Sequence, residues 1–253
     1  MFDFGVDQAA GLRLEAQARH GGPALMPLAS PAMPSRGFEW LCRLAMDLTE
    51  AGQRVVVIDA CATERGDSGG LSHALADAGV VNLGADARPG DPTDWLVMPA
   101  AQGLQSLLAT AAAAGADTAL TRLFAPFAAG ALLLLYAPAQ MLASLLAGVK
   151  ARVMVPVVPQ PQASIDAYGA LKWLHGAGLH PVLAPLEAQS QVLANVVDCA
   201  RRHLELKAPV WTRPAWGQRV PDAALVCADA PAFAPYRSPA RGAHAGAAIP
   251  FWS

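Results

Sequence analysis

The sequence predicts an α/β fold, a doubly wound and mostly parallel sheet with helices on both faces. Two observations predict it. Short, continuous apolar runs such as RVVVIDA (54–60) have the composition of strands that are buried on both faces of a parallel sheet. These runs alternate with segments of helical periodicity, and repeated strand–helix alternation is typical of parallel sheets with crossover helices.

The predicted elements follow one another in order along the chain. The expected strands are 24–30, 54–60, 95–100, 131–136, 151–158, 180–185 and, at the edge, 207–212. The expected helices are 7–20, 38–51, 71–78, 102–114, 140–148, 163–177 and 187–206. Helix 38–51 is the most clearly amphipathic, because Phe38, Leu41 and Leu44 share one face and Gly52 follows its end. The first strand contains Pro27, which removes one hydrogen-bond donor from the ladder.

Length and composition suggest one domain with additions at both ends. A chain of 253 residues can form one large core, or one domain and a tail. We expect residues 1–22 to form an N-terminal helical element and residues 23–212 the α/β domain. In 213–253 prolines accumulate without a period, which favours a flexible tail.

The charge pattern argues against two classes of partner. The net charge is −2 and no basic stripe is visible, so the chain does not have the pattern of a nucleic-acid-binding protein. Residues 124–149 contain no charged side chain, but Pro138 divides them into a strand-like run and a helical run. We therefore expect a buried strand and a buried helix there, not a membrane span.

The start, MFDFGVDQ, lacks the features of a signal peptide, and a cytoplasmic location is expected.

The distribution of lysine bears on function. Residues 24–59 follow the strand, loop, helix and strand order of a phosphate-binding loop protein, yet the first lysine of the chain is Lys150. Such a loop uses a lysine to reach the β- and γ-phosphates. The sequence therefore predicts a nucleotide-hydrolase fold without its chemistry.

Four ordered segments carry a family resemblance. They are DQAAGLR (7–13), AGQRVVVIDA (51–60), VMPAAQGL (97–104) and PQPQASIDAYGALKWL (159–174). In this order they resemble the deviant-Walker ATPases of the ParA and MinD type, and among these the flagellar regulators FlhG, also called FleN. The resemblance implies a P-loop NTPase-like fold.

The chain departs from the family at the phosphate loop. The family's KGGVGKT loop falls on Ala32, Met33, Pro34, Ser35, Arg36, Gly37 and Phe38. Ala32 stands at the signature lysine, Gly37 at the phosphate-binding lysine and Phe38 at the threonine that binds Mg²⁺. Pro34 removes an N–H from the phosphate nest.

Two further positions of the family's metal site are changed. The switch segment retains Asp59 but has Cys61 at the second carboxylate, and Tyr136 replaces an aspartate at the end of a strand. We therefore expect Mg²⁺ and ATP binding to be lost, with no metal, no cofactor and no catalysis in cis. Without that chemistry, Asp59 would bond local backbone, Arg36 would be a solvated loop charge or meet an anion, and Tyr136 would be a core aromatic with a bonded hydroxyl.

The N-terminal segment has a functional and a structural interpretation. In the family, the DQAxxLR element docks on the GTPase FlhF and stimulates GTP hydrolysis. The resemblance implies that Gln8 orients the attacking water in trans, with Asp7, Leu12 and Arg13 as docking contacts. A glutamine amide, both donor and acceptor, suits that task. The alternative is an ordinary amphipathic helix capped by Asp7.

Together, these observations predict an FlhG-like pseudo-ATPase that regulates flagellar assembly or number. Its expected partners are an FlhF-type GTPase and other flagellar assembly proteins, with recruitment to the cell pole or flagellar base, indirect membrane contact, and a dimer left open. The alternatives are a weakly active ParA/MinD-like ATPase and a degenerate ParA-like subunit of another envelope machine, such as cellulose secretion or pilus assembly.

Overall fold

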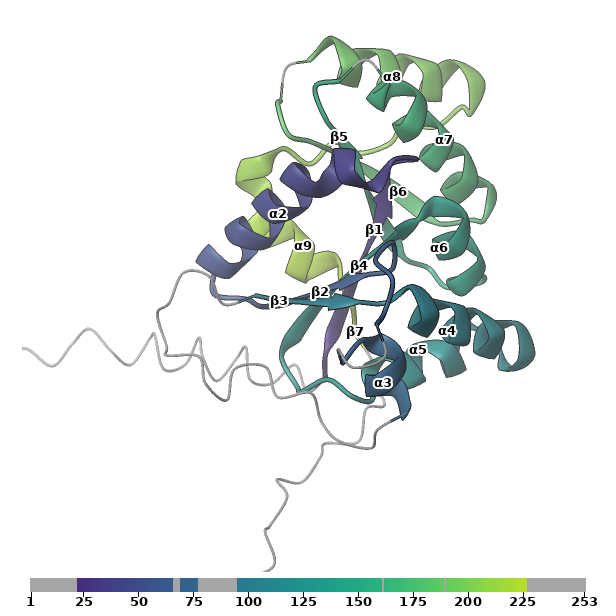
Figure 1. Cartoon of the computed structure of the whole chain (residues 1–253). Coiled ribbons are helices and arrows are strands. Elements are labelled where there is room, and N and C mark those ends of the chain that lie inside the picture. Colours follow the sequence, from purple (N-terminus) through teal and green to yellow (C-terminus); the bar gives the residue numbers. More distant parts are fainter. Residues whose placement is uncertain (1–21, 66–68, 77–94, 161, 189, 227–253) are drawn as a thin grey trace, which may run out of the picture.

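The structure is a computed structural model that describes residues 22–65, 69–76, 95–160, 162–188 and 190–226. It confirms the predicted doubly wound α/β fold. The strands are β1 (Ala24–Ser30), β2 (Arg54–Asp59), β3 (Leu96–Pro99), β4 (Ala131–Pro138), β5 (Arg152–Val157), β6 (His180–Pro185) and β7 (Leu225–Val226). Their order in the sheet is β3-β2-β4-β1-β5-β6, all parallel, and β7 pairs antiparallel with the start of β1 (Figure 1).

Six of the helices in the described residues lie close to predicted positions, and the predicted helix 7–20 lies outside the described residues. The helices are α2 (Phe38–Glu50), α3 (Leu71–Ala76), α4 (Ala101–Ala114), α5 (Ala116–Phe124), α6 (Ala139–Leu145), α7 (Ala163–Gly176), α8 (Gln191–His203) and α9 (Trp216–Ala223). Two short 3-10 helices, η1 (Pro34–Gly37) and η2 (Arg213–Ala215), precede α2 and α9. The sequence did not predict α5 or α9.

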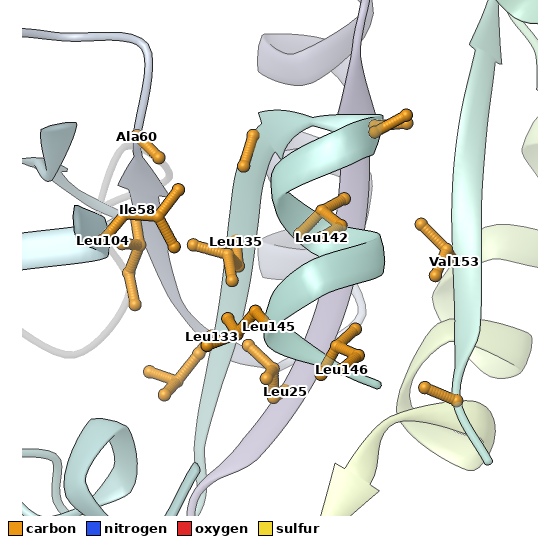
Figure 2. Close-up of a cluster of buried hydrophobic side chains, with 14 of the residues drawn as sticks. Leu25, Ile58, Ala60, Leu104, Leu133, Leu135, Leu142, Leu145, Leu146 and Val153 are labelled. Carbon is orange, nitrogen blue, oxygen red and sulfur yellow. The ribbon is translucent and has the colours of Figure 1, made fainter. Parts of the chain in front are cut away.

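The sheet separates two hydrophobic cores. On one face, α2 and α9 pack through Trp40 and Trp216, whose rings meet edge to face with centroids 5.7 Å apart. Both indole N–H groups are bonded, to Ala184 O and Trp211 O respectively, as buried tryptophans require. On the other face, leucines of α6 point toward the strands, and Figure 2 shows Leu142 and Leu145 beside this core.

The central strand β1 pairs unequally with its two parallel neighbours. β1 pairs with β4 over its whole length but with β5 only at Leu28 and Met154. Pro27 in β1 and Pro156 in β5 each lack the N–H that a continuous ladder would use. The ladder between β1 and β5 is therefore limited to this one pair of residues.

The uncharged stretch 124–149 is buried as predicted. β4 and α6 occupy most of it, and their leucines belong to the core. Among the described residues, no helix has the length and apolar character needed to span a bilayer.

The prediction of an edge strand at 207–212 was wrong. The segment makes one parallel bridge, Leu183 with Val210, through bonds from Leu183 N to Pro209 O and from Trp211 N to Leu183 O. Pro209 has no N–H, so the ladder cannot extend at that residue.

The prediction of a flexible tail from residue 213 was also wrong, as far as residue 226. Trp216 and Val220, one helical turn apart in α9, are fully buried against the face that carries α2. Arg213 anchors the segment through two 2.7 Å bonds to the Asp47 carboxylate. Pro214 lies at the start of η2, where a missing N–H costs nothing. Residues 227–253 lie outside the described residues.

Candidate functional site

The loop after β1 is packed against the side chain of Tyr136. Tyr136 lies near the carboxyl end of β4, the strand next to β1, and is completely buried. Its hydroxyl donates a 2.9 Å hydrogen bond to Pro34 O at the start of η1. A Cβ added to Gly37 would lie 2.2 Å from that hydroxyl oxygen and 3.0 Å from Pro31 Cδ. The phenol thus fills the space under the loop, and only glycine fits at position 37.

The loop uses its own amides internally. Arg36 N donates to Met33 O at 3.0 Å, and Phe38 N donates to Ser35 O. Pro34 has no amide hydrogen to offer. An anion cradle needs several free N–H groups that point at one centre. Two amides of residues 34–38 are therefore bonded within the turn, and Pro34 offers none.

The cation of the loop is turned toward a carboxylate. Arg36 Nη1 lies 3.7 Å from Asp166 Oδ2 in the first turn of α7. The Arg36 side chain is 31% exposed, whereas Asp166 is nearly buried. Arg36 is therefore a partly exposed cation that forms an ion pair with a side chain of α7. The other predicted loop residues, Ala32, Ser35 and Phe38, are exposed.

Asp59 lies beside Tyr136 in the register of β2 and β4 and is almost completely buried. Its carboxylate accepts a 2.9 Å hydrogen bond from Cys61 N. Burial raises the pKa of Asp59, and the bonds from the amides of Cys61 and Ala62 oppose the rise. Burial also raises the pKa of Tyr136, so its hydroxyl remains a donor. Asp59 therefore bonds to the backbone that directly follows β2, whereas Tyr136 bonds to the backbone of the loop after β1.

A second buried carboxylate escaped the sequence analysis. Glu64 follows β2 and is 6% exposed. Its Oε1 accepts from Gly103 N at 2.6 Å, and its Oε2 accepts from Ser72 N at 2.7 Å and from the Ser72 hydroxyl. Glu64 therefore caps the N-termini of α3 and α4 together, where helix dipoles favour negative charge. Its partners are 8 and 39 residues away, so no local pattern marks it.

The residues predicted to contact a GTPase cannot be placed. Asp7, Gln8, Leu12 and Arg13 lie in 1–21, outside the described residues. The described residues contain no group of three metal-binding side chains of the His, Cys, Asp or Glu type.

Comparison with known proteins gives only similarities of structure. No protein-family model matches the chain, and no curated protein matches it significantly. The chain is similar to a solved partition protein at 15% identity, over 80% of this chain and 65% of that one, with a TM-score of 0.43. It thus spans less than two thirds of the partition protein's length.

Two further solved structures are similar. One is a McdA–ATP complex from Cyanothece, with 12% identity over 81% of this chain and 89% of the other, and a TM-score of 0.45. The other is a ParA family ATPase from Chlorobium tepidum TLS, with 9% identity over 80% and 90%, and a TM-score of 0.39. Values this low do not assign the chain to a family.

Proposed function

We propose that this chain is an FlhG-like pseudo-ATPase that regulates flagellar assembly by contact with partner proteins. One observation carries the proposal: the Tyr136 hydroxyl holds Pro34 O and occupies the space next to Gly37. A phosphate loop of this fold would need that space, free amides and a cation. Here the phenol fills the space, two of the amides are bonded within the turn, and Arg36 faces Asp166.

The proposal predicts that the domain does not use nucleotide. A titration of the full chain with a fluorescent ATP analogue and Mg²⁺ tests this. We expect no saturable signal at millimolar nucleotide, for the wild type and for Tyr136→Phe alike, because removing one hydroxyl supplies neither lysine nor carboxylate. Saturable binding at micromolar concentration, with ATP turnover, would instead support the weakly active ATPase.

The proposed partner is an FlhF-type GTPase, which the N-terminal residues would contact. In this proposal Gln8 orients the attacking water, while Asp7, Leu12 and Arg13 hold the segment on the GTPase. Adding the full chain to the GTPase with GTP should accelerate hydrolysis. Gln8→Ala should abolish the acceleration and retain binding, and Leu12→Ala should weaken binding.

Gln17→Ala is the matched control, because it removes the same amide from the same segment. It should leave the stimulated rate unchanged. If Gln8→Ala stimulates GTP hydrolysis as well as the wild type, the trans-acting role is wrong. If the chain does not bind the GTPase at all, the flagellar assignment fails, and a subunit of another envelope machine becomes the better proposal.

A further inference from the structure

A small cavity with two polar side chains in its lining lies between the end of β1 and the start of α7. Its volume is about 10 Å³, roughly the room that one water molecule needs. Its lining includes the residues that directly follow the single β1–β5 pair, Leu28 and Met154. Its lining residues are Ala29, Ser30, Pro31, Val155, Pro156, Val158, Ala163, Asp166, Ala167 and Ala170.

Two buried polar atoms of this lining have no hydrogen-bond partner among the described residues. They are the hydroxyl oxygen of Ser30 and Oδ2 of Asp166. Ser30 is 8% exposed and the Asp166 side chain is 7% exposed. Buried polar atoms are nearly always bonded to protein or to ordered water, so two such atoms on one cavity require a common explanation.

The protein around the cavity does not supply the missing bonds. Pro31 and Pro156 have no N–H, and the other lining side chains besides Ser30 and Asp166 are apolar. Arg36 Nη1 is 3.7 Å from Asp166 Oδ2, which is an ion pair but too long for a hydrogen bond. The Cys61 thiol lies near the Ser30 hydroxyl: burial raises the pKa of the thiol, and the hydroxyl opposes that rise. The two groups do not have hydrogen-bond geometry, so Cys61 does not provide the missing partner of Ser30.

We propose that this cavity is a binding site for one ordered water molecule that bridges Ser30 and Asp166. The water accepts a hydrogen bond from the Ser30 hydroxyl and donates one to Asp166 Oδ2. The cavity is too small for an organic ligand, and the carboxylate disfavours an anion. A metal cation is disfavoured because the Arg36 guanidinium already faces the same carboxylate oxygen. The water joins β1 to α7 at the point where direct pairing between β1 and β5 has ended.

This inference does not depend on the proposed function, and crystallography of the full wild-type chain tests it. At a resolution of about 1.5 Å we expect a density peak about 2.6–3.2 Å from both Ser30 Oγ and Asp166 Oδ2. An empty cavity would overturn the proposal. A crystal soaked in rubidium chloride should show no anomalous peak at this position, and such a peak would identify a cation site and also overturn it.

A double-mutant cycle supplies an independent test. Ser30→Ala should lower Tm by roughly 2–4 °C, the shift expected when a domain of this size loses about one hydrogen bond. In the Asp166→Asn background the same substitution should have a clearly different effect, because the two residues share one water. Ser35→Ala, at an exposed serine in the loop that follows β1, should leave Tm unchanged. Additive effects of the Ser30 and Asp166 substitutions would contradict a shared water.

Discussion

The loops after β1 and β2 leave the same edge of the sheet, but their interiors are built differently. The loop after β1 is filled by an aromatic ring, with the Tyr136 hydroxyl bonded to Pro34 O. The loop after β2 contains a buried carboxylate, Glu64, which accepts bonds from the first turns of α3 and α4. The Glu64 carboxylate is stabilised because backbone amides of two helices donate hydrogen bonds to it. The Tyr136 hydroxyl needs only one acceptor, and Pro34 O supplies it.

The largest effect is expected from a substitution of Glu64, in the loop after β2. Glu64→Ala removes the acceptor of three hydrogen bonds and leaves two helix-terminal amides buried without a partner. We expect the free energy of unfolding to fall by roughly 3 kcal/mol. Urea unfolding measures it. Glu39→Ala, at an exposed first-turn glutamate of α2, is the control and should change stability by about 0.5 kcal/mol or less. Equal effects of the two substitutions would show that Glu64 does not hold the helices.

The next largest effect is expected from a substitution of Gly37, in the loop after β1 that packs against Tyr136. Gly37→Ala places a methyl group 2.2 Å from the Tyr136 hydroxyl, so the loop or the ring must move. Overpacking of this kind destabilises by about 2 kcal/mol. Gly169→Ala is the matched control, because a Cβ there meets nothing within 4 Å and alanine favours the helix.

Tyr136→Phe tests whether the clash is with the hydroxyl. In the Tyr136→Phe background, Gly37→Ala should cost clearly less, because the closest atom is gone, as a double-mutant cycle of unfolding free energies would show. Full additivity would place the strain elsewhere.

A smaller effect comes from Tyr136→Phe alone. The substitution removes one hydrogen bond and leaves Pro34 O without its donor, while the ring still fills the loop. We expect a loss of about 1 kcal/mol in urea unfolding. A loss as large as that of Gly37→Ala would mean that the hydrogen bond, and not the shape of the ring, keeps the loop closed.

Apolar runs predicted the strands of the sheet well, because a strand buried on both faces has few alternatives for its side chains. The same reasoning failed for α9. Prolines 214 and 221 indicated an extended tail, whereas burial of Trp216 and Val220 stabilises a helix in spite of Pro221. Tertiary packing decided the conformation there, and only contacts with α2 reveal it.

For the loop after β1, the sequence predicted which residues are unusual but not which side chains they contact. The absence of lysine and the unusual residues of 32–38 follow from sequence alone. The bond from Tyr136 to Pro34 spans 102 residues, and the pair of Arg36 with Asp166 joins two elements that are distant in the chain. Such contacts depend on how strands order themselves in the sheet. The sequence therefore identified which residues were unusual, and the fold determined what they touch.

The smallest expected effect concerns Asp59, the last residue of β2. Burial raises its pKa above the value of 3.8 for a free side chain, so the folded state favours the protonated carboxyl. The stability that Asp59 contributes is fully present below about pH 3.8 and is lost as the pH rises through its folded pKa.

Asp59→Asn keeps an acceptor for Cys61 N without the charge, so the variant should gain stability over the wild type as the pH rises from 4 to 7. Urea unfolding across this range measures the difference, with Asp117→Asn at an exposed carboxylate as control. If the stability of the variant relative to wild type does not increase between pH 4 and pH 7, the folded state does not favour the protonated Asp59 carboxyl, and the predicted rise of its pKa is wrong.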